Sequence, residues 1–91
     1  MDLTIGDFGW AWHRLKEGER VFRSGWNGKG MFLYLVNGND FSTAFRYGYG
    51  EYAGEPRFED SIAIKTAQNT ISVGWKPTNL DMFANDWEVV E

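Results

Sequence analysis

Apolar residues near the start of the chain recur with the spacing of one face of a helix. They stand at positions i, i+3, i+4 and i+7, and they are Phe8, Ala11, Trp12 and Leu15. This spacing predicts an amphipathic helix over residues 8–17. Asp7 is the expected N-cap, with Thr4 as an alternative start, and Gly18 stands where helices commonly end in a left-handed residue. His13 lies off the apolar face, a position more typical of a solvated surface histidine than of a catalytic one.

Two segments in the first half of the chain predict strands. Residues 21–23 are a short strand candidate. Residues 31–36 are apolar throughout, which indicates a strand that is central in its sheet or covered on both faces. The Asn37-Gly38 pair that follows is a strong turn signal.

The second half of the chain predicts a hairpin and a short helix. Residues 61–66 and 70–75 alternate apolar with polar positions and are joined by three residues, so they indicate two antiparallel strands. A short helical turn is expected near residues 80–85, with Thr78 or Asn79 as its cap.

These elements predict one α+β domain spanning residues 1–91. An N-terminal helix and a short C-terminal helical turn pack on a mostly antiparallel sheet, and residues 86–91 supply its last strand. Residues 39–59 show no regular pattern. Their glycines and aromatic residues suit either a long functional loop or a distorted hairpin.

Composition narrows the function classes. The 91 residues include no cysteine and one histidine, so we expect neither disulfides nor a structural zinc ion. Aromatic residues make up 18% of the chain, which is more than the thin core of so small a domain needs. Part of this surplus is expected to face a ligand or another subunit.

Charge and hydropathy exclude two kinds of partner. The net charge of -4 argues against binding polymeric nucleic acid, which usually requires a basic surplus. The longest apolar run, residues 31–36, is too short to span a bilayer, so we expect no membrane partner. The opening residues MDLTIGD lack the features of a signal peptide, and we expect a cytoplasmic protein.

Candidate catalytic groups are few. Four acidic residues lie close together in sequence and offer a carboxylate pair of the kind that glycoside hydrolysis uses; they are Glu51, Glu55, Glu59 and Asp60. Neighbouring carboxylates in a loop more often form a solvated surface. The Gly-Asn-Gly-Lys-Gly-like turn is not a phosphate-binding P-loop, because Lys29 is followed by Gly30-Met31 and not by the serine or threonine that a P-loop requires.

The segment Ser24-Gly-Trp-Asn-Gly-Lys-Gly30 fits a binding site better. Its glycines allow backbone N–H groups to approach an anion, and Lys29 is placed to contact a phosphate. Trp26 is able to stack on a base, and Asn27 offers both a donor and an acceptor to a base edge. The same residues also suit a purely structural role, with Trp26 in the core and Asn27-Gly28 as a simple turn.

Five motifs in this sequence resemble the Thoeris anti-defence 2 domain family of phages and prophages. The matching stretches are Leu15-Lys16-Glu17-Gly18, Arg23-Ser24-Gly25-Trp26-Asn27-Gly28-Lys29, Met31-Phe32-Leu33, Lys65-Thr66-Ala67 and Asp81-Met82-Phe83-Ala84-Asn85-Asp86-Trp87. Phe83 is a conservative departure from the family pattern, which has leucine there. The resemblance covers the chain except for residues 39–59.

The resemblance implies a sponge for an immune signal. Family members bind glycocyclic ADP-ribose, the signal made by bacterial Thoeris TIR enzymes, and hold it without degrading it. They form homo-oligomers, commonly tetramers built from two dimers, with ligand pockets at subunit interfaces. Some also bind cyclic dinucleotides at a second site. By resemblance, this chain is therefore expected to act without catalysis or cofactor in the cytoplasm of the infected bacterial host.

The resemblance and the residue chemistry together suggest a ligand-binding set. It comprises Arg23, Trp26, Asn27, Gly28, Lys29, Gly30, Met31, Trp75, Thr78, Asn79 and Asp81. Trp26 and Asn27 are expected to form one wall of the pocket, and Trp75 a second. Gly28 and Gly30 are expected to bring the backbone up to the ligand, with Gly28 at a positive φ.

The remaining polar members of the set have simpler expected roles. Thr78, Asn79 and Asp81 are expected to hydrogen-bond ribose hydroxyls, and Lys29 to face the negative charge. Further cations are Arg23, Arg46 and Arg57.

The sequence leaves one further tryptophan and two alternative functions to consider. Trp87 is expected to pack the last strand onto the core rather than to bind ligand. Two other functions also remain: a hydrolase or lyase that destroys a nucleotide signal by using Glu51, Glu55 or Asp60, and a module that binds a host protein through its aromatic loop.

Overall fold

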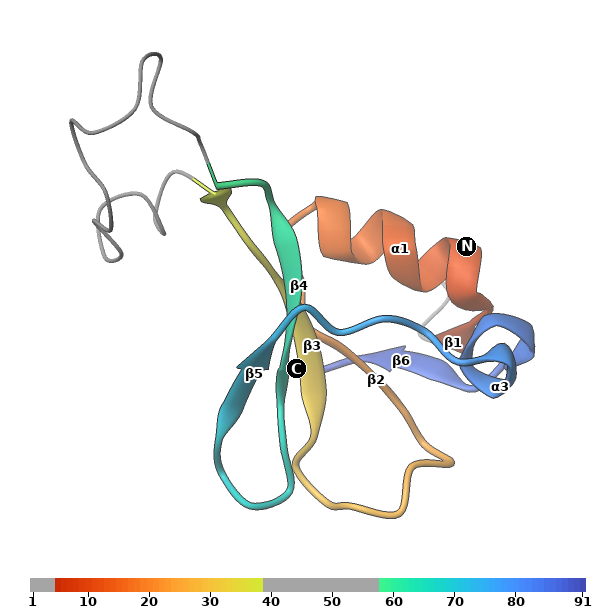
Figure 1. Cartoon of the computed structure of the whole chain (residues 1–91). Coiled ribbons are helices and arrows are strands. Elements are labelled where there is room, and N and C mark those ends of the chain that lie inside the picture. The colour runs from red at the N-terminus through yellow and green to blue at the C-terminus, as the bar shows by residue number, and fades with distance from the viewer. Residues whose placement is uncertain (1–4, 39–57) are drawn as a thin grey trace, which may run out of the picture.

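Six antiparallel strands form one sheet with the order β1-β6-β2-β3-β4-β5 (Figure 1). The computed structural model describes residues 5–38 and 58–91. The strands are β1 (Ile5–Gly6), β2 (Val21–Arg23), β3 (Phe32–Val36), β4 (Ser61–Lys65), β5 (Ile71–Val73) and β6 (Trp87–Val89). The helices are α1 (Phe8–Lys16) and α3 (Asn79–Phe83). The predicted α+β architecture is confirmed.

Helix α1 forms where the apolar spacing predicts it. The Asp7 side chain accepts a hydrogen bond of 2.9 Å from the backbone N–H of Trp10, which satisfies one of the free donors at the start of the helix. Ala11 and Leu15 are completely buried. The chain leaves the helix through Gly18 at a φ of +88°, so both predicted end signals are confirmed.

The core lies between α1 and the middle of the sheet. Its fully buried members come from both layers and are Ala11, Leu15, Val21, Leu33 and Trp87. Strand β3 lies between β2 and β4, so the prediction of a central strand is confirmed. Trp87 is the largest fully buried side chain among the described residues, which confirms its expected place in the core.

Strands β4 and β5 form the predicted hairpin. Their register pairs Ala63 with Val73 and Lys65 with Ile71. The turn between them is closed by a hydrogen bond of 2.8 Å from the Thr66 N–H to the Thr70 carbonyl.

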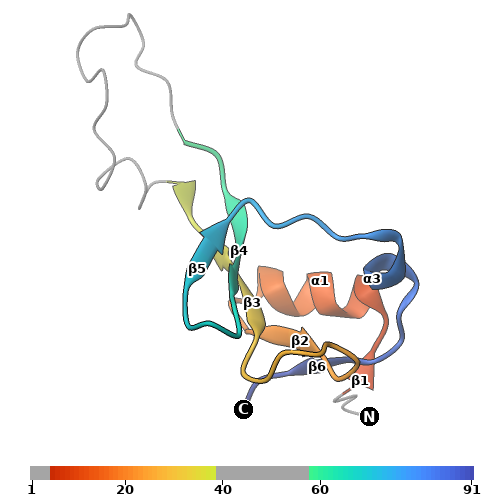
Figure 2. The same ribbon diagram turned by 60° about the horizontal axis from the view of Figure 1, so that its bottom comes forward.

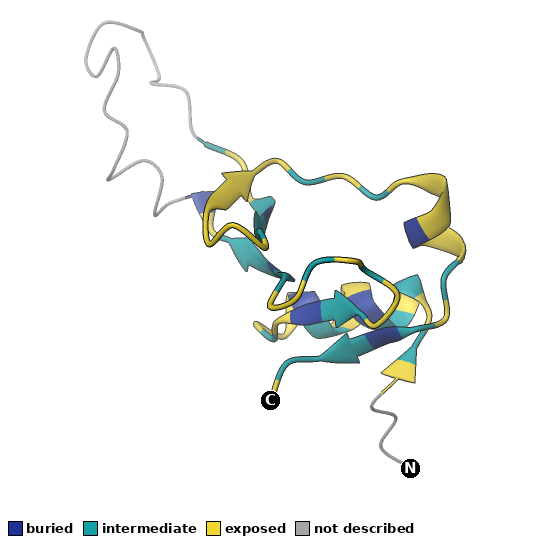
Figure 3. Cartoon of the chain, turned by 90° about the horizontal axis from the view of Figure 1, so that it is seen from below, coloured by how far each residue is buried: buried dark blue, intermediate teal, exposed yellow. Residues whose placement is uncertain are grey.

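The short C-terminal helix is also confirmed, with a slightly different end. Thr78 is its N-cap, and Thr78 and Asp81 form a capping box, in which each side chain accepts a hydrogen bond from the other residue's backbone N–H. The helix stops at Phe83 rather than Asn85. It lies beside the N-terminal part of α1 (Figure 2). In Figure 3 most of α3 is exposed, and Asp81 is its one buried residue.

Strand β1 was not predicted from the pattern. It has only two residues and pairs with β6, and two residues are too few to show alternation. Gly6 lies where a Cβ would come within 2.6 Å of the Trp10 ring, so the close approach of strand and helix accounts for this glycine.

Some predictions fall on residues outside the described ranges. The loop or distorted hairpin expected at residues 39–59 lies outside these ranges except for residues 58 and 59. Glu51, Glu55, Arg46 and Arg57 also lie outside them. Within the described ranges, no helix is long and apolar enough to cross a membrane.

Candidate functional site

Arg23 joins the Gly-rich turn to the C-terminal segment. It is the last residue of β2, so its side chain points to the same sheet face as its cross-strand partner Trp87. The Arg23 Nε donates a hydrogen bond of 2.9 Å to Asp86 Oδ1, and one terminal nitrogen donates another of 2.9 Å to Asp81 Oδ1. The guanidinium therefore connects two carboxylates that lie 58 and 63 positions away in sequence.

Asp81 is the most enclosed charged group of this cluster. Only 6% of the residue is exposed. Its Oδ1 accepts from Arg23 and, over 3.4 Å, from the Trp26 indole N–H, while its Oδ2 accepts from the Thr78 N–H and hydroxyl at 2.9 Å each. Burial by itself would raise the pKa of Asp81. The hydrogen bonds from Thr78, Arg23 and Trp26 outweigh burial and hold this pKa below its usual value.

Asp86 fixes the start of the Gly-rich turn. Its Oδ2 accepts a hydrogen bond of 2.7 Å from the Gly25 N–H, and its carbonyl accepts one of 3.1 Å from the Ser24 N–H. Burial would raise the pKa of Asp86, but Arg23 and the Gly25 N–H lower it more, so this pKa too lies below its usual value. The hydrogen bond to Asp86 raises the pKa of Arg23, which stays charged at any physiological pH.

Three indole rings pack next to this ion-pair cluster. The ring centroids of Trp26 and Trp87 are 5.4 Å apart, those of Trp75 and Trp87 6.3 Å, and those of Trp26 and Trp75 6.5 Å. All three pairs meet edge to face, a favourable arrangement for aromatic rings. Trp87 is buried, whereas Trp26 and Trp75 are half-buried. The two expected aromatic walls are therefore in contact, and Trp26 also packs against the core.

The glycines of the turn differ from the expectation at one position. Gly30 has the left-handed backbone, with a φ of +76°, and Gly28 is not among the positive-φ residues. The expectation of a positive φ at Gly28 is wrong. A Cβ on Gly28 would come within 2.6 Å of Met31 Sδ and 2.7 Å of Ala67 Cβ. Gly28 is thus explained by close packing of the turn against the β4–β5 hairpin.

The structure brings only part of the predicted set together. Arg23, Trp26, Trp75, Thr78 and Asp81 form one contiguous cluster. Other members lie along the turn or at the start of α3; they are Asn27, Gly28, Lys29, Gly30, Met31 and Asn79. Asn27, Lys29, Gly30 and Asn79 are exposed, which leaves them accessible to a ligand. Their roles stay predictions.

Asp86 is a member of the cluster that residue-by-residue reasoning did not select. Its sequence signal is the Asp86-Trp87 pair near the end of the chain, a family motif for which the sequence predicts a role, in packing, for Trp87 alone. Pairing of Trp87 with Arg23 across β6 and β2 places the neighbouring Asp86 against the guanidinium. This register joins residues that are far apart in the sequence, so the spacing of residues along the chain does not reveal it. Within the described ranges, no group of acidic, histidine or cysteine side chains is placed to hold a metal ion.

Comparison with known proteins identifies the family of this chain. Residues 6–90 match the model of the Thoeris anti-defense 2-like domain. The chain is also 48% identical over 87 residues to a protein of Bacillus phage SP01 named "Thoeris anti-defense 2", a match that covers 96% of this chain and 97% of the relative. These descriptions name a role against a bacterial defence system and no enzymatic activity. The resemblance seen in the motifs is confirmed, and the chain belongs to the Thoeris anti-defense 2-like family of phage anti-defence proteins.

Proposed function

We propose that this protein is a sponge that binds glycocyclic ADP-ribose and holds it without degrading it. The observation that carries this proposal is the cluster of Trp26, Trp75 and Trp87 next to the ion pairs of Arg23. Trp26 and Trp75 are half-buried and in contact with each other, and the Gly-rich turn next to them is fixed by Asp86 and Arg23. Rigid aromatic walls beside a turn rich in backbone N–H groups suit a ligand that combines a base with phosphates.

In this proposal Asp81 and its hydrogen-bond partner Arg23 hold the site residues in place and do not contact the ligand. Both oxygens of Asp81 already accept hydrogen bonds from Arg23, Trp26 and Thr78, and the residue is nearly inaccessible. In this proposal Asp81 therefore positions Trp26 and Thr78, while exposed Asn27, Lys29 and Asn79 make the polar contacts with ribose and phosphate.

The two carboxylates of the cluster, Asp81 and Asp86, are poorly suited to act as a general base. A general base works best with a pKa near the operating pH, yet hydrogen bonds keep the pKa of Asp81 and of Asp86 low and both are paired with Arg23. Asp60, an acidic residue of the hydrolase alternative, accepts a hydrogen bond of 2.8 Å from the Gly38 N–H.

The proposal extends to assembly and place of action. Helix α3 exposes three large apolar side chains, Leu80, Met82 and Phe83, and apolar groups clustered in this way are typical of contact surfaces. We therefore expect a homo-oligomer, with a tetramer as the family resemblance implies, acting in the cytoplasm of the infected bacterium. The resemblance also implies cyclic dinucleotides as ligands of a second site. The net charge of -4 and the shortness of the longest apolar run argue against polymeric nucleic acid and a membrane as partners.

One experiment separates the sponge from an enzyme and from a host-protein interaction module. The protein is mixed with glycocyclic ADP-ribose, the free ligand is measured, the protein is denatured by heat, and the released compound is identified by mass spectrometry. A sponge depletes the free ligand and then releases it intact. Release of an altered compound indicates an enzyme, and no depletion before heating supports the interaction module.

Two variants connect that result to the site. Asn27→Ala is expected to lower the amount of ligand captured while the protein stays folded, because Asn27 is exposed. Trp26→Ala is expected to weaken binding by about 1–3 kcal/mol through loss of a stacking wall. Its packing against Trp75 and Trp87 means that it also lowers stability, so its binding is compared at a temperature where it is shown to be folded. Unchanged capture by both variants would contradict this site.

A further inference from the structure

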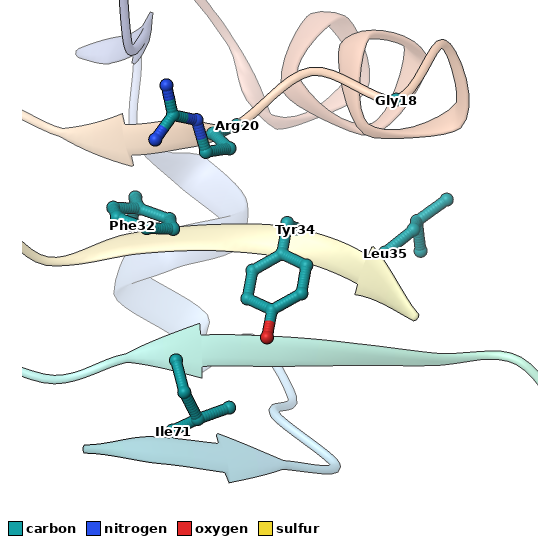
Figure 4. Close-up of a pocket in the computed structure, with 6 residues that line it drawn as sticks. All are labelled: Gly18, Arg20, Phe32, Tyr34, Leu35 and Ile71. Atoms are coloured by element: carbon teal, nitrogen blue, oxygen red, sulfur yellow. The ribbon is translucent and has the colours of Figure 1, made fainter. Parts of the chain in front are cut away.

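The chain contains the dipeptide Asn-Gly twice, as Asn27-Gly28 and as Asn37-Gly38. The two pairs stand before and after strand β3, whose Phe32, Tyr34 and Leu35 side chains are shown in Figure 4. We propose that Asn27 is a site of spontaneous deamidation, and that the fold protects Asn37 from the same reaction. An asparagine followed by glycine is especially prone to this reaction, because glycine places no side chain beside the attacking backbone nitrogen.

Deamidation at Asn27 requires only the chain itself and water. The backbone nitrogen of Gly28 attacks the side-chain carbonyl carbon of Asn27, a bond forms between these two atoms, and the Cγ–Nδ2 bond breaks. The side-chain nitrogen leaves as ammonia with the proton that the Gly28 nitrogen gives up, and a cyclic imide remains. Water then opens this ring at either carbonyl and yields aspartate or isoaspartate, each of which is ionised at neutral pH.

The surroundings of Asn27 leave this reaction open. Asn27 is exposed and lies in the turn between β2 and β3, outside any helix or strand. Within residues 5–38 and 58–91, neither its side chain nor the Gly28 N–H takes part in a hydrogen bond. The Gly28 nitrogen therefore reaches the side chain without first breaking a hydrogen bond. Packing of Gly28 against Met31 and Ala67 limits movement of the turn, so we expect a slower reaction than in an unfolded chain.

Asn37-Gly38 is the same dipeptide with its attacking nitrogen held in place. The Gly38 N–H donates a hydrogen bond of 2.8 Å to Asp60 Oδ1, and Gly38 is buried. A Cβ on Gly38 would overlap the backbone carbonyl of Phe58, so this glycine is also closely packed. A hydrogen bond to a charged group must break before the Gly38 nitrogen reacts, which slows the reaction at Asn37.

Deamidation of Asn27 should lower capture of the signal, and this part of the inference rests on the proposed function. There, exposed Asn27 contacts the ribose and phosphates of the ligand, and a carboxylate at the same position would repel a phosphate. Isoaspartate also adds one atom to the backbone of a turn that Asp86 fixes at Gly25. We therefore expect the deamidated protein to bind the signal at least about tenfold more weakly.

Mass spectrometry tests the modification directly. The full-length protein is incubated at mildly alkaline pH, which favours loss of the proton from the attacking nitrogen, and samples taken over time are digested. Fragment spectra locate each conversion of an amide to a carboxylate. In the folded protein we expect Asn27 to deamidate at least about tenfold faster than Asn37. In a sample unfolded by guanidinium, the two sites should react at similar rates, which shows that the difference comes from the fold.

Variants connect the modification to capture of glycocyclic ADP-ribose. Asn27→Asp imitates one product and should bind at least about tenfold more weakly than the fresh unchanged protein. Asn27→Gln is the matched control, because glutamine keeps the amide and would have to close a larger, less readily formed ring. During incubation the unchanged protein should lose capture in step with deamidation at Asn27, whereas Asn27→Gln should keep the capture that it shows when fresh.

Two mass measurements would overturn the modification site. One is an intact Asn27 in the folded protein while the unfolded chain deamidates at both sites. The other is equal rates at Asn27 and Asn37 in the folded protein. Full capture by Asn27→Asp and by the incubated protein would overturn the effect on binding. Absence of capture by the fresh protein would contradict the sponge proposal, and the mass measurements would still decide whether Asn27 is the modified residue.

Discussion

Asp81 shows how one residue determines the geometry of a whole site. Only 6% of the residue is exposed, and its carboxylate accepts hydrogen bonds from Arg23, Trp26 and Thr78. Asp81→Ala would leave the Arg23 guanidinium without one carboxylate and remove the capping box of α3. We expect it to lower the free energy of unfolding by about 2–4 kcal/mol. Urea denaturation measures this loss.

The exposed pair of His13 and Glu17 provides the control for Asp81. These side chains are 66% and 47% exposed, and exposed pairs contribute about 0–1 kcal/mol. Glu17→Ala should therefore change stability by less than about 1 kcal/mol. A loss for Asp81→Ala as small as that for Glu17→Ala would show that the carboxylate does not hold the site together.

Gly28 is a second residue whose replacement tests the geometry. A Cβ there meets Met31 and Ala67, so Gly28→Val is expected to cost about 1–3 kcal/mol of stability through overpacking and to abolish capture of the signal by displacing the turn. Asn27→Ala, at the exposed neighbouring position, should leave the melting temperature almost unchanged. Thermal unfolding with parallel binding measurements checks both variants. Full stability of Gly28→Val would mean that the turn is not packed against the hairpin.

At the scale of the elements, α3 is attached to the sheet by ionised carboxylates, and this makes stability depend on pH. Asp81 and Asp86 have folded-state pKa values below their ordinary value, which is about 3.9 in an unfolded chain. Such groups contribute stability above that unfolded value and lose it as pH falls through the lower folded value.

The free energy of unfolding should therefore not change through these two groups between pH 7 and 5, and should fall below about pH 4. Chemical denaturation at a series of pH values tests this. The Asp86→Asn variant, in which one of the two groups cannot titrate, should show a shallower fall. An equally steep fall in this variant would assign the acid sensitivity to other carboxylates.

Elements with a strong local signal were predictable, and those that depend on distant partners were not. The capped apolar stripe of α1 and the alternation of the β4–β5 hairpin fixed those elements within a residue or two at each end. Strand β1 was missed because its two residues are a strand only through pairing with β6.

The same distinction holds for the candidate site. The Gly-rich turn and the Thr78 cap have local signatures, and both were found in the sequence. The contacts of Arg23 with Asp81 and Asp86 span 58 and 63 positions, so they required the sheet order to be known. The positive φ belongs to Gly30 and not to Gly28, and the sequence does not distinguish them, because the backbone conformation of each glycine in a turn depends on how the turn packs.

For the molecule as a whole, the sponge proposal requires discrimination more than affinity, since linear relatives of the signal are abundant. A cyclic ligand is already bent and loses less freedom on binding than its open-chain form. Walls fixed by mutual packing, as those of Trp26 and Trp75 are, should favour the compact form. We expect a preference of at least about a hundredfold over linear ADP-ribose, near 2.7 kcal/mol. Competition titrations measure it, and equal competition by linear ADP-ribose would show that only the base and phosphates are recognised.

The apolar surface of α3 makes the assembly of the protein testable. Leu80, Met82 and Phe83 are 77%, 54% and 81% exposed, although α3 is firmly held from its inner side by Asp81. A rigid helix that presents three large apolar side chains to solvent is stabilised when another subunit covers them. Light scattering at micromolar concentration should therefore give a mass above that of the monomer, with a tetramer expected.

A charge placed on this surface should reduce that mass. Phe83→Glu would bury an unpaired carboxylate in the interface, which is strongly unfavourable. Asn85→Glu adds the same charge at an exposed position just beyond α3 and should leave the assembly intact. A monomeric mass for the unchanged protein would contradict oligomerisation itself. An unchanged oligomer in Phe83→Glu would place the contact on another surface, and binding of the signal by each species would then show whether the ligand site needs more than one subunit.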